Sequence, residues 1–173
     1  IFDTTLKPIL DRDEQLVFII IDCLRMDQWK VISKLLYPGF NIKEGYHISI
    51  IPTATPFARN SIFSGLLPND LKNKYPDIWK KMFYENKLNG FEEQLMNNLL
   101  AHNKMQHLSH KYIKISDLKS GNKFNNKIND YKSTDILSIV VNFVDILGHS
   151  RSESKVLSEL IPNDAAYRKA IFN

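Results

Sequence analysis

The chain has 173 residues, and its 23 basic and 19 acidic side chains give a formal net charge of +4. Apolar residues make up 43% and charged residues 24%, as in ordinary globular proteins, which argues against a disordered chain. A single cysteine, Cys23, excludes an internal disulfide framework and a multi-cysteine zinc site. The longest apolar run is far short of the ~20 residues of a membrane helix, and no signal peptide is visible. We therefore expect a cytoplasmic protein with no membrane partner.

The first part of the chain predicts one strong strand followed by a helix. Residues 1–14 are mixed and charged, and we expect a linker or the end of a preceding helical segment there. The run 15–22, QLVFIIID, predicts a strand buried on both faces, as in parallel sheets, and it ends at Asp22. The apolar spacing over 26–36 predicts a helix.

The middle of the chain predicts a second strand and several helices. Residues 46–51 are bounded by glycine and proline and predict a strand, and residues 57–66 predict a helix. Residues 70–89 are polar and predict a loop with a short helix. Apolar residues at helical spacing over 91–100 predict an amphipathic helix.

The last part predicts a third strong strand. Residues 112–115 predict a weak strand, and 116–133, rich in Lys, Asn and Asp, predict a long exposed loop. The apolar run within 135–144 predicts a buried strand, and helices are expected at 152–160 and 164–172. Strands alternating with helices predict an α/β fold with a mostly parallel sheet flanked by helices.

Polar residues follow three of the predicted strands. Asp22 follows the first strand, Thr53 and Thr55 follow the second, and Asp145 with His149 follow the third. In parallel sheets, ligands bind beyond the carboxyl ends of the strands. This clustering is the main functional signal of the sequence.

The segment D22-C-L-R-M-D27 permits two interpretations. Asp22 at a strand end suits a metal ligand, and Arg25 suits an anion or the neutralisation of Asp27. The alternative is that Asp22 caps the next helix, a common role for aspartate. Cys23, without a second cysteine, is expected to be a small buried apolar residue.

The segment P52-T-A-T-P-F-A-R59 also permits two interpretations. The hydroxyl of Thr55 at a helix start suits a nucleophile, which a metal activates, and Arg59 one turn later suits two oxygens of a phosphate. The alternative is a helix cap by Thr53 or Thr55, with Arg59 in solvent.

The segment D145-I-L-G148-H149 has a carboxylate and an imidazole four residues apart, on an expected turn where Gly148 eases the bend. Zinc accepts these oxygen and nitrogen ligands. The alternative is a capping aspartate with a surface histidine, because two ligands do not complete a tetrahedral site.

Taken together, these motifs resemble the alkaline phosphatase superfamily of two-metal phospho- and sulfohydrolases. The turn P-T-A-T is similar to that of nucleotide pyrophosphatase/phosphodiesterases, whose second threonine attacks phosphorus. Thr55, Arg59, Ser64 and Gly65 also resemble the sulfatase signature, a nucleophile followed by arginine and a hydroxyl–glycine pair. Both comparisons select Thr55.

The runs FIIIDCLRMDQW and PTATPFARNSIFSGLLP resemble the PglZ domain within that superfamily, in the form that serves as the output domain of a response regulator linked to type IX secretion. The resemblance implies an alkaline-phosphatase-like core over residues 15–173, of which this chain is the N-terminal part and is truncated at its C-terminus. A D-H pair that the superfamily needs for its metals is missing from the sequence.

The resemblance implies a phosphodiesterase or phosphatase with two divalent metals, expected to be zinc. Asp22 and Thr55 would bind one metal, and Asp145 and His149 the other. Thr55 would be the nucleophile and Arg59 would help hold the phosphoryl oxygens. With the site half present, the fragment alone is expected to be inactive. His102, His107 and His110 precede Asp145 and are expected to be exposed polar residues.

The implied partners are a phosphate-ester substrate, with nucleotides and oligonucleotides as candidates, a sensor kinase or other signalling proteins, and a second copy in a homodimer. Lysines of 111–132 interleaved with aromatic residues suit a nucleic acid. A solvated loop is the favoured alternative, because the spacing gives no single face and aspartates interrupt it. A non-catalytic protein-interaction module is the alternative function.

Overall fold

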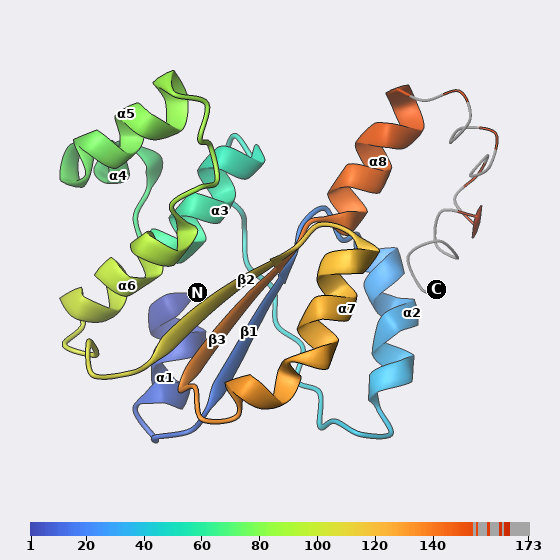
Figure 1. Ribbon diagram of the computed structural model, residues 1–173, viewed down its shortest axis with the longest axis horizontal. Helices are drawn as coiled ribbons and strands as arrows, with labels where there is room; N and C mark the ends of the chain where they lie inside the picture. The colour runs from blue at the N-terminus through green and yellow to red at the C-terminus, as the bar shows by residue number, and fades with distance from the viewer. Residues whose placement is uncertain (154, 156–158, 160–162, 164, 167–173) are drawn as a thin grey trace. The chain divides into compact units, whose positions relative to one another are not determined.

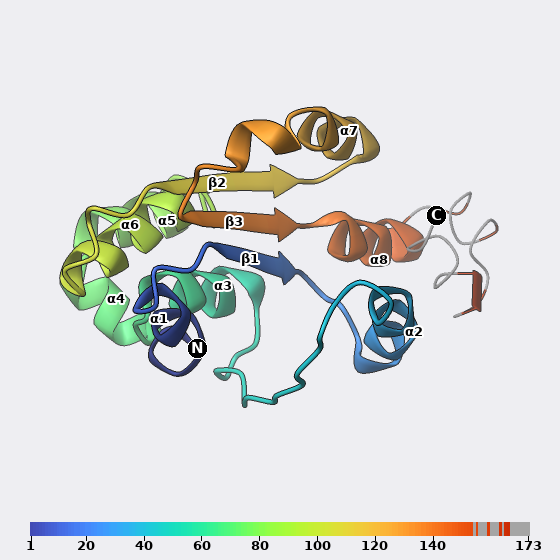
Figure 2. The ribbon, with the colours of Figure 1, turned by 90° about the horizontal axis from the view of Figure 1, so that it is seen from below.

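The computed structural model describes residues 1–153, 155, 159, 163, 165 and 166. Its sheet has three strands in the order β1-β3-β2, formed by β1 (Leu16–Ile21), β2 (His110–Ile115) and β3 (Ile136–Val141). The three arrows point the same way in Figure 2, so the sheet is parallel. The α/β fold with a parallel sheet is thereby confirmed. No helix in the described part of the chain has the length and apolar character needed to cross a membrane.

The chain divides into two compact units, each built from segments distant in sequence. The first unit comprises residues 1–18, 47–112 and 129–138, and the second comprises residues 19–46, 113–128 and 139–173.

In the first unit, residues 1–14 begin with helical turns. A π-helical segment η1 (Phe2–Leu6) leads directly into α1 (Lys7–Leu10). Phe2, Leu6 and Leu10 are buried, since they recur on one side of these turns. The expected boundary after residue 14 stays a prediction.

The rest of the first unit is a group of helices. They are α3 (Thr55–Ser64), α4 (Pro68–Lys74), α5 (Pro76–Tyr84) and α6 (Glu92–His102). The first three carry proline in the first turn, where its missing N–H costs nothing. Helix α3 packs against α6, as Figure 1 shows. Residues 70–89, expected to be a loop with a short helix, are mostly helical, because proline at a helix start favours rather than breaks the helix.

The second unit contains α2 (Met26–Leu36), which the sequence predicts correctly, and α7 (Leu118–Asn126). The expectation of a loop over 116–133 is wrong at α7. Asp117 caps this helix by accepting a 2.7 Å hydrogen bond from the Ser120 backbone N–H. The polar composition concealed a short, well-capped helix.

Two strand predictions also need correction. Strand β1 is not buried on both faces, because Val17 and Ile19 are 57% and 54% exposed. A continuous apolar run does not by itself tell how many faces of a strand are covered. Residues 46–51 form no strand, and Ile48 and Ile51 are exposed. A strand needs a partner backbone as well as a suitable pattern.

Strand β3 is buried along almost its whole length, as predicted. Helix α8 (Phe143–Glu153) begins two residues after it. The expected turn at 145–149 is therefore helix. The helices expected at 152–160 and 164–172 lie largely outside the described residues.

Candidate functional site

Asp22 directly follows β1, as the sequence predicts. Its backbone N–H donates a 3.0 Å hydrogen bond to the carbonyl of Val141, the last residue of β3. The carboxyl ends of β1 and β3 therefore meet at Asp22. Helix α2 has Arg25, not Asp22, at its N-cap position, so the capping role considered for Asp22 is not the one the structure shows.

Cys23 lies next to Asp145. Its backbone is left-handed, with φ at 59°, a conformation uncommon for residues other than glycine, asparagine and aspartate. The exposed thiol donates a 2.9 Å hydrogen bond to Oδ1 of Asp145. The expectation of a buried apolar cysteine is wrong, because the turn after β1 brings the thiol to a carboxylate.

Asp145 and His149 form an i, i+4 pair within α8. Nε2 of His149 lies 3.4 Å from Oδ1 of Asp145, and the imidazole is exposed. Residues four apart share one helix face, so this pair presents an oxygen and a nitrogen together. That donor chemistry fits zinc. Within the described residues, however, no group of three or more His, Cys, Asp or Glu is arranged to hold a metal ion.

Arg25 is paired with Asp27. Its Nε and Nη2 donate hydrogen bonds of 3.0 and 2.8 Å to the two carboxylate oxygens of Asp27, and both side chains are exposed. Of the two roles considered for Arg25, the structure shows the neutralisation of Asp27.

Thr55 is the first residue of α3, and no strand precedes it directly. Ala54 occupies the N-cap position, and no side chain caps the helix. Thr53 and Thr55 are thus not caps. Thr55 is half-buried, and its side chain makes no hydrogen bond to any other described residue. A hydroxyl at a helix start lies where the helix dipole favours an anion.

Arg59 is buried rather than in solvent. It is 3% exposed, and its guanidinium donates to both oxygens of Glu92, with Nε–Oε1 and Nη2–Oε2 distances of 2.8 and 2.7 Å. The alternative interpretation, a solvated arginine, is therefore wrong. The role of Arg59 toward a phosphoryl group stays a prediction.

The sequence gives no signal for the partners of Arg59. Glu92 is in the first turn of α6, where an acidic residue is ordinary because of the helix dipole. Asn89 and Tyr112 also donate to its carboxylate. Burial, followed by the charge of Glu92, raises the pKa of Tyr112.

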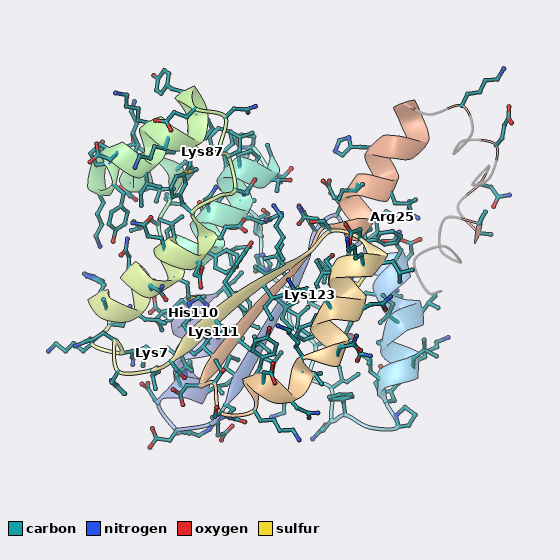
Figure 3. The ribbon with its side chains drawn as sticks, viewed as in Figure 1. Lys7, Arg25, Lys87, His110, Lys111 and Lys123 are labelled. Carbon is teal, nitrogen blue, oxygen red and sulfur yellow. The ribbon has the colours of Figure 1, made fainter. Side chains whose placement is uncertain are left out.

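The three histidines expected to be exposed, His102, His107 and His110, differ from one another. His102 and His107 are exposed, as expected. His110, labelled in Figure 3, is partly buried, with Nδ1 2.7 Å from Oδ1 of Asn97 and Nε2 3.0 Å from Oγ of Ser138. Burial lowers its pKa to about 4. These contacts make His110 a packing residue of the first unit.

The predicted site residues belong to two groups. Asp22, Asp145 and His149 are in the second unit, and Cys23 connects the turn after β1 to Asp145. Thr55 and Arg59 are in the first unit, at the start of α3.

Comparison with known proteins adds a family. The family model described as the BREX system PglZ alkaline phosphatase-like domain matches residues 1–171. None of the curated proteins searched matches the chain at a significant level.

Proposed function

Because the chain belongs to the PglZ family of alkaline phosphatase-like domains, we propose that it carries the nucleophile and part of the metal site of a phosphohydrolase. The observation that carries the proposal is Thr55, a hydroxyl at the start of α3 that neither caps the helix nor binds another described side chain. The proposed reaction is hydrolysis of a phosphodiester or phosphomonoester.

Asp22, Asp145 and His149 would contribute ligands to divalent metals, and zinc is the proposed identity. Metals bound there would stabilise the charge of a phosphoryl group and favour the ionised form of a bound hydroxyl. The 3.4 Å approach of His149 to Asp145 supports a shared cation, since the two donors already lie on one helix face.

Thr55 would act as the nucleophile. Its oxygen loses a proton and bonds to phosphorus while the bond to the leaving alcohol breaks, which leaves a phosphothreonine. Water then attacks phosphorus, releases phosphate or a phosphomonoester, and regenerates the hydroxyl. The start of α3 favours the negative charge through its dipole.

The signalling setting of this activity is part of the same proposal. The motifs are similar to those of the output domain of PorX, a response regulator of Bacteroidetes linked to type IX secretion, whereas the family description names the BREX system. A receiver domain encoded ahead of this chain in the same gene would support the signalling context. Absence of a receiver domain from that gene would contradict it.

The test is a pair of threonine variants in the full-length protein, assayed on bis(4-nitrophenyl) phosphate with zinc. We expect Thr55→Ala to reduce turnover by about a thousandfold or more, because the nucleophile is lost. Thr53→Ala is the matched control, two residues away in the same segment, and should stay near the wild-type rate. Equal rates for wild type and Thr55→Ala would exclude Thr55 as the nucleophile.

The alternative function is a non-catalytic interaction module. The buried pairing of Arg59 favours it, since this arginine does not present its guanidinium to solvent. Metal content of the purified full-length protein separates the two: two zinc ions per chain support the enzyme, and none supports the module.

A further inference from the structure

A buried ion pair within the first unit joins α3 to the start of α6. Arg59 and Glu92 are 3% and 1% exposed and make two parallel N–H···O bonds. A guanidinium and a carboxylate match in this geometry, which gives the pair a fixed orientation as well as energy. Arg59 lies one helical turn after Thr55 in α3.

Two further hydrogen bonds to Glu92 add to this ion pair. Asn89 Nδ2 donates a 3.0 Å bond to Oε1 of Glu92, and the Tyr112 hydroxyl donates to Oε2. Glu92 therefore has protein donors on both oxygens, as a buried carboxylate requires.

Asn60, the residue after Arg59, makes a second connection. It is fully buried, and its Nδ2 donates to the carbonyls of Pro56 and Leu88 at 2.6 and 2.9 Å. Pro56 is in the first turn of α3. The side chains of Arg59 and Asn60 thus hold the first turns of α3 against residues 88–92. We call this set of contacts the 88–92 clasp.

We propose that Glu92 and Arg59 are positioning residues: the 88–92 clasp fixes the first turn of α3 and with it the hydroxyl of Thr55. The inference rests on the proposed function, in which Thr55 is the nucleophile. It assigns Arg59 a role through Glu92 and not through contact with the substrate. An error of about 1 Å in the placement of a reacting group can cost about a hundredfold in rate.

The experiment compares Arg59→Met with the double variant Arg59→Met/Glu92→Met in the full-length protein. The single variant leaves the Glu92 carboxylate buried without its cation, whereas the double variant replaces the whole pair by apolar side chains of similar length. Buried ion pairs often tolerate such replacement, but not the removal of one partner.

We expect turnover of bis(4-nitrophenyl) phosphate to fall about a hundredfold in the single variant. The double variant should recover to within about tenfold of wild type, with KM unchanged. An arginine that contacts phosphate would leave both variants equally inactive, which would overturn the inference.

Hydrogen exchange of the amides at 57–62 provides a readout independent of activity. We expect exchange to be fastest in Arg59→Met and closer to the wild-type rate in the double variant, in which Asn89 and Tyr112 still lose their acceptor. Arg59→Lys, which keeps the charge but loses the paired geometry, is the mild variant in case Arg59→Met does not fold, and should also exchange faster. Wild-type exchange in both single variants would contradict the positioning role. Activity retained by Thr55→Ala would refute the proposed function separately, because the exchange result does not depend on it.

Discussion

The thiol of Cys23 lies 2.9 Å from Oδ1 of Asp145, although the two residues are 122 positions apart in the chain. The same oxygen lies 3.4 Å from Nε2 of His149. A cysteine that is expected from the sequence to be buried is therefore exposed beside two of the proposed metal ligands. Because of this contact, the reactivity of the thiol should change when a ligand binds to that carboxylate.

Zinc should slow the alkylation of Cys23. A cation on Asp145 and His149 would compete for the oxygen to which the thiol donates and would crowd its surroundings. We expect the rate with iodoacetamide, followed by intact mass, to fall as zinc is added. The protection should vanish in His149→Ala and persist in His102→Ala, which removes an exposed histidine of α6. Equal rates with and without zinc in the wild-type protein would contradict metal binding at this pair.

His110 should make stability depend on pH. Its folded-state pKa is lowered to about 4 by burial, while an unfolded histidine titrates near 6.5. Between these values the unfolded state binds more protons, so the free energy of unfolding falls as pH decreases from about 6.5 to about 4. Urea denaturation at several pH values measures this slope.

Two histidine variants isolate that effect. His110→Gln should remove much of the slope, since glutamine does not titrate. His107→Gln removes an exposed histidine and should retain the slope. The same pH dependence in the His110→Gln variant would show that other groups cause it.

Gly65→Ala should destabilise the first unit. Gly65 ends α3 with φ at 67°, and an added Cβ would lie 2.9 Å from Cδ1 of Leu99 in α6. The left-handed backbone and the close contact together predict a loss of about 1–3 kcal/mol in the free energy of unfolding. Gly45→Ala is the control, because nothing lies within 4 Å of its added Cβ. Equal midpoints of urea denaturation for both variants would contradict the account.

The lysines of α7 form a row that the sequence did not show. Lys119 and Lys123 in α7 and Lys127 at its C-cap position are exposed and recur every four residues, and Figure 3 labels Lys123 on this helix. One of the two reasons for expecting a solvated loop was the lack of a common face, and the helix removes that reason. The other reason, the interrupting aspartates, is unchanged. We propose that this row attracts an anionic, oligonucleotide-type partner.

Salt dependence tests this proposal. Fluorescence anisotropy of a single-stranded oligonucleotide should show binding that weakens with salt. Changing the three lysines to glutamine should reduce the magnitude of the slope of log K against log salt by about 2. Each lost phosphate contact accounts for about 0.7 of that slope. The control changes Lys72, Lys74 and Lys81 of α4 and α5, with the same loss of charge. Equal slopes for the two triple variants would place the contact elsewhere.

The sequence alone determined the fold class and the local elements whose pattern is strong. The buried run of β3 and the helix over 26–36 follow from apolar spacing, which local chemistry controls. Asp22 at a strand end was equally predictable. The motif order in the sequence indicated the family, which the family match then confirmed.

The partners of these residues depend on contacts that form only in the folded chain. Residues 46–51 have a strand pattern but no ladder, since pairing needs a second backbone. The burial of Arg59 depends on Glu92 and Tyr112, which are 33 and 53 positions away along the chain. Spacing within a segment fixes which side chains share a helix face, but desolvation and ion pairing depend on what the fold brings opposite that face.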